Sequence, residues 1–142
     1  MFLPRVIPVI FFVFIFGSIV RAETFQIEMQ KNGESREFSV EIARIDIGDT
    51  VEWLPVTKGH NIEFRMGPEG STLPKKSKLS QPVEVKFDVP GVYFYWCTPH
   101  KSMGMIGLVV VGNDTSNLEE ISKAFALGES KKKLQELIKP LI

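Results

Sequence analysis

The sequence predicts an all-β fold, a sandwich or barrel of short strands, followed by two α-helices. Between Glu23 and Val111, short runs of apolar residues alternate with polar ones, which is the period of half-buried strands. Turns that contain glycine or proline separate these runs. After Gly112 the apolar residues recur with the period of a helix. The chain has 142 residues, enough for one domain with a core of its own.

The N-terminal segment has the features of a secretory signal peptide. Arg5 supplies a positive charge, Val6–Phe16 is an apolar run, and small residues lead to a cleavage site after Ala22. A retained membrane anchor is the alternative, but this apolar run is short for a bilayer span. We expect a cleaved signal peptide at 1–22, a β-domain at 23–112, and a helical extension of the same domain at 113–142.

Charge and cysteine content narrow the function classes. The chain has 17 basic and 17 acidic residues, and loss of Arg5 and Arg21 with the signal peptide leaves 15 basic residues against 17 acidic ones. This slightly acidic balance argues against nucleic acid as a partner. A single cysteine, Cys97, excludes an internal disulfide. In an exported protein such a thiol is buried and inert, reactive, or bound to a metal.

Each predicted strand has a recognisable pattern. Alternation or apolar continuity indicates strands at 25–29, 38–42, 45–47, 51–54, 83–87, 92–97 and 106–111. The run 92–97 is nearly continuous in aromatic residues, and the run 106–111 has the composition of a fully buried strand. Between Arg65 and Pro82 the pattern fails, and glycine, proline and lysine predict a long surface loop.

Two helices are predicted after the last strand. Ser116 and Glu119 have the spacing of a capping box, and Leu118, Ile121 and Phe125 share one helical face before Gly128 ends the helix. Ser130 is predicted to cap a second helix, whose apolar face holds Leu134, Leu137, Ile138 and Leu141. We expect both apolar faces to pack on the β-domain.

The residues with distinctive chemistry cluster between two predicted strands. Cys97 ends one strand and Met105 precedes the next, so the tight loop between them brings a thiol, the imidazole of His100 and a thioether together. The only other histidine, His60, follows the 51–54 strand, and neighbouring strands can bring both loops to one end of the domain. Two imidazoles, one thiolate and a weak axial thioether are the ligands of a blue-copper site.

These segments resemble the cupredoxins, and among them the pseudoazurins. The resemblance rests on Gly59-His60-Asn61, on Cys97-Thr98-Pro99-His100 and on Met105, with the Cys-x2-His-x4-Met spacing and the helical tail. It implies a Greek-key cupredoxin β-sandwich with the two helices packed on it. It also implies that His60, Cys97 and His100 are equatorial ligands and that Met105, not Met103, is the axial one. The side chain of Asn61 would join the two ligand loops at Thr98.

The resemblance further implies a periplasmic electron carrier that is not an enzyme. One copper ion would cycle between Cu(I) and Cu(II), and His100 would be the electron port. The implied partners are redox proteins such as copper nitrite reductase, nitrous-oxide reductase or cytochromes. We expect no nucleic acid as a partner, no membrane association after signal cleavage, and a monomer. Lysines 58, 75, 76, 78 and 101 suggest a basic ring around the port. Trp96 departs from the family, where a lysine often precedes the cysteine.

Two other functions use the same residues. A copper storage or delivery protein would need exposed, exchangeable ligands rather than a buried loop site. A Cys–His hydrolase would use Cys97 as its nucleophile, and it requires a substrate cleft with an oxyanion hole. The predicted position of the thiol at the end of a buried aromatic strand disfavours both alternatives.

Overall fold

The computed structural model describes residues 21–32 and 35–142 and divides its strands between two sheets. The predicted signal peptide, 1–22, lies outside the described residues apart from Arg21 and Ala22. The strands are β1 (Thr24–Asn32), β2 (Ser35–Phe38), β3 (Ile42–Ile45), β4 (Thr50–Pro55), β5 (Glu63–Met66), β6 (Val83–Lys86), β7 (Gly91–Trp96) and β8 (Ile106–Val111).

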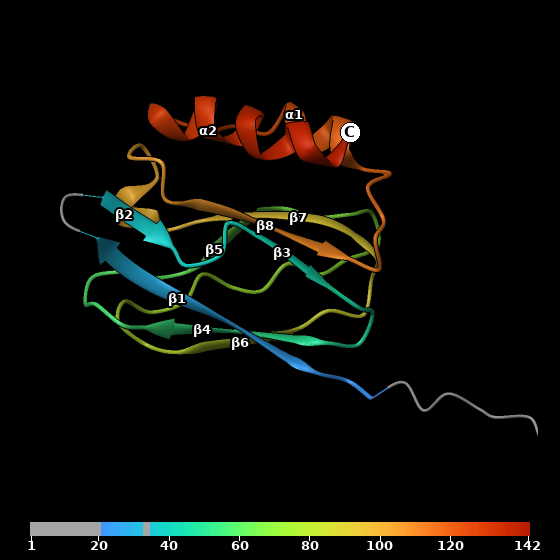
Figure 1. The fold of residues 1–142 in the computed structure, drawn as a ribbon, viewed down its shortest axis with the longest axis horizontal. Helices are drawn as coiled ribbons and strands as arrows, with labels where there is room; N and C mark the ends of the chain where they lie inside the picture. The colour runs from blue at the N-terminus through green and yellow to red at the C-terminus, as the bar shows by residue number, and fades with distance from the viewer. Residues whose placement is uncertain (1–20, 33–34) are drawn as a thin grey trace, which may run out of the picture.

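The two sheets pack as a sandwich, which confirms the predicted all-β fold (Figure 1). One sheet has the order β2-β1-β4-β6, and the other has the order β3-β8-β7-β5. Strand β1 runs parallel to β4, and β3 runs parallel to β8, whereas the other neighbours are antiparallel. Parallel neighbours cannot be joined by a tight hairpin, so the chain crosses between the sheets, and loops distant in sequence meet at one end.

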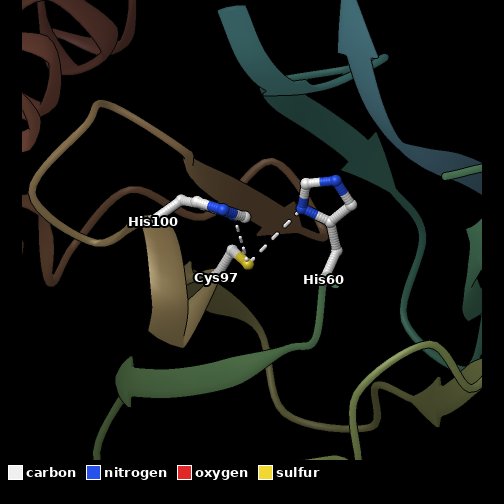
Figure 2. A group of neighbouring side chains, drawn as sticks. All are labelled: His60, Cys97 and His100. Carbon is white, nitrogen blue, oxygen red and sulfur yellow. Dashed lines mark hydrogen bonds between the residues drawn. The ribbon is translucent and has the colours of Figure 1, made fainter. Parts of the chain in front are cut away.

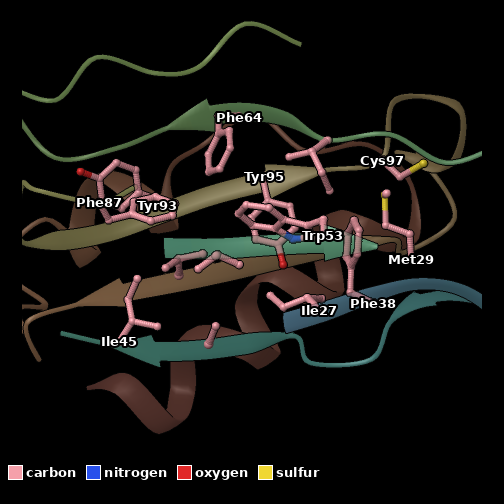
Figure 3. Close-up of a cluster of buried hydrophobic side chains, with 14 of the residues drawn as sticks. Ile27, Met29, Phe38, Ile45, Trp53, Phe64, Phe87, Tyr93, Tyr95 and Cys97 are labelled. Carbon is pink, nitrogen blue, oxygen red and sulfur yellow. The ribbon is translucent and has the colours of Figure 1, made fainter. Parts of the chain in front are cut away.

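The main core lies between the sheets and follows the alternation in the sequence (Figure 3). Ile27 and Met29 on β1, Trp53 on β4 and Tyr95 on β7 are fully buried there. The Trp53 ring meets Phe64 and Tyr95 edge to face, with ring centroids 5.7 and 5.2 Å apart. Such edge-to-face contacts add to the stability that comes from burying the rings.

A second apolar layer covers the outer face of β7 and β8. Helix α1 (Leu118–Ser122), helix α2 (Glu129–Ile138) and the 3-10 turn η2 (Lys139–Leu141) lie over this sheet (Figure 1). Their buried residues pack on alternate side chains of the two strands, such as Phe94 and Leu108. Both strands are therefore buried on both faces, which explains their continuous apolar sequences. The predicted docking of both helices is confirmed.

Several local predictions are wrong. The capping box at Ser116 does not form, because Asn117 is the N-cap residue and makes no capping bond with its side chain. That side chain instead exchanges two hydrogen bonds of 2.8 Å with the backbone of Val92. Helix α1 ends at Ser122, so Phe125 lies beyond it and is 65% exposed. Gly128, not Ser130, is the N-cap residue of α2.

The strands predicted at 38–42 and 45–47 are also wrong, because β2 ends at Phe38 and residues 39–41 separate it from β3. Strand β3 ends at Ile45, and Ile47 is exposed in the turn that leads to β4. The long loop predicted between Arg65 and Pro82 is confirmed from Gly67 onward. In the part of the chain that the structure describes, no helix has both the length and the apolar character needed to cross a membrane.

Candidate metal centre

The loop from Cys97 to Met105 connects the end of β7 to the start of β8. Cys97 directly follows β7, and the 3-10 turn η1 (Thr98–His100) begins at the next residue, with Pro99 suited to its first turn. The Cys97 N–H donates to the carbonyl of Met105 at 3.0 Å, and the His100 N–H donates to the carbonyl of Cys97 at 3.1 Å. The turn therefore places the thiol and the imidazole of His100 close together.

His60 reaches the same place from the loop between β4 and β5. Gly59 precedes it with a φ of +91°, a conformation that side chains disfavour. The Gly59 N–H donates to Ser80 Oγ at 2.9 Å, and the His60 carbonyl accepts from the Ser80 N–H at 2.8 Å. The imidazole is buried, and its Nε2 lies 3.0 Å from Thr57 Oγ1. This contact leaves Nδ1 facing Cys97.

The thiol and the two imidazoles converge on one point (Figure 2). Cys97 Sγ lies 3.7 Å from His60 Nδ1 and 3.4 Å from His100 Nδ1. The three donor atoms all lie within 4.8 Å of one another. A soft thiolate with two imidazole nitrogens matches the donor preference of copper better than that of magnesium or calcium, which favour oxygen ligands. The donor set therefore fits a copper ion.

Asn61 joins the two ligand loops, as the resemblance implied. Its Nδ2 donates to Thr98 Oγ1 at 3.1 Å, and its Oδ1 accepts from the Thr98 N–H at 2.8 Å. Asn61 follows His60 and Thr98 follows Cys97, so this pair of hydrogen bonds connects the neighbours of two predicted ligands. The connection therefore links the two ligand loops without involving any of the donor atoms.

Comparisons with known proteins agree with this geometry. A family model described as copper binding proteins, plastocyanin/azurin family, matches residues 25–112. The chain belongs to this family. It is 37% identical to pseudoazurin of Paracoccus pantotrophus over 107 residues, which cover 72% of this chain and 73% of that protein. It is 44% identical to pseudoazurin of Methylorubrum extorquens over 84 residues, or 58% and 56% of the two chains.

Solved structures give the same result. The crystal structure of pseudoazurin from Methylobacterium extorquens matches with a TM-score of 0.77 at 34% identity, covering 84% of this chain and 99% of that one. The predicted resemblance is thereby confirmed. As a pseudoazurin-like cupredoxin, the chain binds one copper ion and carries electrons, and it is not an enzyme.

The two methionines of the cupredoxin ligand loop have different surroundings. Met105 is fully buried in the same core cluster as Cys97, whereas Met103 is 50% exposed. Met105 is also paired with Cys97 through the backbone, since its carbonyl accepts the Cys97 N–H at 3.0 Å. The structure thus brings His60, Cys97 and His100 together and places Met105 beside them. Its burial favours Met105 over Met103 as the axial ligand.

Burial controls the protonation of the donors before copper binds. It lowers the pKa of His100 to about 4, with help from the charges of His60 and Arg36. It also lowers the pKa of His60, to which Arg36 contributes. Both imidazoles are therefore neutral at pH 7 and have a nitrogen lone pair for a metal. Burial raises the pKa of the Cys97 thiol more than hydrogen bonds from the backbones of Asn61 and His100 lower it.

This raised thiol pKa bears on the hydrolase alternative. A nucleophilic cysteine needs a low pKa and access to substrate, whereas Cys97 is fully buried. Copper binding must displace the thiol proton, because the thiolate is the ligand. The buried thiol therefore suits a metal centre and not a nucleophile.

Sequence reasoning missed several residues that support the cupredoxin site. Ser77 and Ser80 from the long loop hold the His60 loop, where Ser77 Oγ accepts from the Ile62 N–H at 2.9 Å. Ser130 on α2 is buried, and its Oγ accepts from the Gly104 N–H in the ligand loop at 3.1 Å. These partners lie 15 to 26 residues from the groups they bind. No local motif marks such distant pairs.

Proposed function

We propose that this cupredoxin is a periplasmic carrier that passes one electron at a time to a redox enzyme such as a denitrification reductase. In this proposal, His60, Cys97 and His100 are the equatorial copper ligands and Met105 is the axial one. The convergence of the thiol and two imidazoles within 4.8 Å carries the proposal. The signal peptide predicted at 1–22 and the similarity to pseudoazurins support export.

The donor set suits one-electron transfer. Cu(I) favours few, soft ligands, whereas Cu(II) favours a harder, tetragonal set, and a trigonal site with a weak axial thioether is a compromise between them. The Asn61–Thr98 link and the backbone bonds within the ligand loop restrain the donors before the metal arrives. A site that moves little between oxidation states exchanges electrons quickly. The same restraint disfavours the storage and delivery alternative.

The surroundings of His100 are suited to brief contact with a partner. His100 is half-buried, and the neighbouring Pro99 and Met103 are exposed. Lys75, Lys76 and Lys78 lie exposed on the long loop that binds the His60 loop, so they belong to the copper end of the molecule. Positive charge around an apolar contact would steer an acidic redox partner and weaken with salt.

Copper loading of the apoprotein tests the function. Addition of Cu(II) should give one equivalent of bound metal, an intense blue thiolate-to-copper absorption, and a reversible one-electron redox titration. Cys97→Ser should abolish the blue absorption while its far-UV circular dichroism stays that of the wild type. A colourless wild-type complex would contradict the proposal. Export is tested by N-terminal sequencing of the protein from a periplasmic extract, and recovery from the cytoplasm alone would refute it.

A further inference from the structure

One carboxylate oxygen binds the residues on both sides of Cys97. Glu63 Oε2 accepts a hydrogen bond from the indole Nε1 of Trp96 at 2.7 Å and another from Thr98 Oγ1 at 2.8 Å. Glu63 begins β5 and stands opposite Trp96 in the β5–β7 pair. The carboxylate is therefore presented by a strand and not by a loose loop. It thereby holds the residue before Cys97 and the residue after it.

The other oxygen of Glu63 is also held. Arg65 Nη1 donates to Oε1 at 3.0 Å, and the Arg65 guanidinium lies 4.4 Å from the centre of the Trp96 ring. The ammonium of Lys101 lies 5.6 Å from the same ring. Both distances are in the range of cation–π contacts. The indole is thus fixed by its N–H on Glu63 and by cations over its ring.

The hydrogen bonds of Glu63 also reach the second ligand loop. The Thr98 hydroxyl donates to Glu63 and accepts from Asn61 Nδ2, and the Thr98 N–H donates to Asn61 Oδ1. Asn61 follows His60. A continuous set of hydrogen bonds therefore runs from Glu63 through Thr98 to the neighbour of His60, and from Glu63 through Trp96 to the other side of Cys97.

We propose that Glu63 is a positioning residue that sets the orientation of the Cys97 thiolate toward copper by holding Trp96 and Thr98. This inference rests on the proposed copper site. Groups that orient metal ligands without touching the metal influence both its affinity and its electronic properties. Trp96 stands where the resemblance leads one to expect a lysine, so the indole bond to Glu63 is a feature of this chain's own sequence.

Glu63→Gln is the main test, because an amide cannot replace this carboxylate. If its oxygen accepts from Trp96 and Thr98, its NH₂ group faces the Arg65 donor, and if it is flipped, the NH₂ group faces the indole N–H and the hydroxyl. In the apoprotein, NMR should show faster solvent exchange of the Trp96 indole N–H and the Thr98 amide than in wild type. Copper affinity should fall about 10- to 100-fold, and the blue absorption should change in position or relative band intensity.

Two further variants separate hydrogen bonding from charge. Trp96→Phe keeps a ring but removes the indole donor, and Thr98→Val removes the hydroxyl. Both preserve net charge, so a change in their blue absorption cannot come from removing a carboxylate. The change that each variant causes in the blue absorption should be smaller in a Glu63→Gln background, because coupled residues show non-additive effects. These variants also decide the question if Glu63→Gln does not fold.

Glu69→Gln is the matched control for charge. Glu69 is exposed on the loop beside Pro90, at the opposite end of β7 from Cys97. The Glu69→Gln substitution should leave copper affinity, blue absorption and solvent exchange of the Trp96 indole N–H unchanged. Wild-type values of all three for Glu63→Gln, or wild-type copper affinity and blue absorption for both Trp96→Phe and Thr98→Val, would overturn this inference alone. A wild-type protein that forms no blue centre would overturn the proposed function as well.

Discussion

The two nitrogens of the His60 imidazole face different partners. Nε2 lies 3.0 Å from Thr57 Oγ1, and Nδ1 lies 3.7 Å from Cys97 Sγ. If Nε2 carries the proton and donates it to the hydroxyl, the lone pair of Nδ1 points at the copper position. A hydrogen bond on the distal nitrogen fixes the tautomer and ring orientation of a histidine ligand. Thr57 is therefore suited to prepare His60 for copper.

The axial position gives a prediction for a single residue. Met105→Gln should keep a blue site but lower its reduction potential, because an amide is a harder ligand than a thioether and favours Cu(II). A tenfold shift in relative affinity toward Cu(II) corresponds to about 59 mV, and we expect a decrease of at least that size. Met103→Gln, at the exposed neighbouring methionine, is the control and should leave the potential unchanged. The reverse pattern in a redox titration would assign the axial role to Met103.

Among single residues, the predicted copper ligands were easier to find in the sequence than the residues that hold them by hydrogen bonds. Cys97 and His100 lie within one short loop, and His60 is the only other histidine, so spacing and residue type predict these three donors, whereas the choice of Met105 over Met103 came from the resemblance. Asn61 was predictable only through the resemblance. Glu63 was not predicted, because its hydrogen bonds reach 33 and 35 residues along the chain, and a partly exposed glutamate has no local signal.

Among the elements, β7 and β8 contribute side chains to both apolar cores of the molecule. Their inner side chains meet the opposite sheet, and their outer side chains meet the helices. Gly107 on β8 faces the inner core where Tyr95 lies. A Cβ at this position would collide with the Tyr95 ring and hydroxyl. The glycine therefore makes room for a fully buried aromatic side chain.

Gly107→Ala should accordingly destabilise the protein. Overpacking a well-filled core costs about 1–3 kcal/mol in the free energy of unfolding, and Tyr95 has no exposed side from which to retreat. Urea denaturation of the apoprotein measures the cost. In a Tyr95→Phe background, where part of the contact is gone, the same change should cost less. Equal cost in both backgrounds would show that Tyr95 is not the cause.

Strands were easier to predict than helix ends. The continuous apolar runs of β7 and β8 are pronounced because both faces are covered. In contrast, the Ser116–Glu119 spacing suggested a cap, but Asn117 binds the Val92 backbone, and this tertiary contact sets where α1 begins. Serine is a common N-cap residue, yet the Ser130 hydroxyl accepts a hydrogen bond from Gly104 in the ligand loop instead. Side-chain hydrogen bonds to distant backbone override local capping patterns.

For the whole molecule, the donors of the copper site link folding to pH. Burial, then the charges of His60 and Arg36, hold the pKa of His100 at about 4 in the folded apoprotein, below its ordinary value of 6.5. Between these values the unfolded chain takes up a proton that the folded chain does not. Stability therefore falls as pH decreases through this window. The lowered pKa of His60 acts in the same direction.

Thermal unfolding at pH 7, 6 and 5 tests this linkage. The melting temperature of the apoprotein should fall over this range, because each proton bound only by the unfolded chain costs about 1.4 kcal/mol per pH unit at full effect. His100→Gln removes one of these protons, so its decrease should be smaller. The melting temperature of the copper-loaded protein should also fall less over this pH range, since bound metal occupies both imidazoles and stabilises the folded state that binds it. Identical slopes for the apoprotein, His100→Gln and the loaded protein would show that protonation of the site does not govern acid stability.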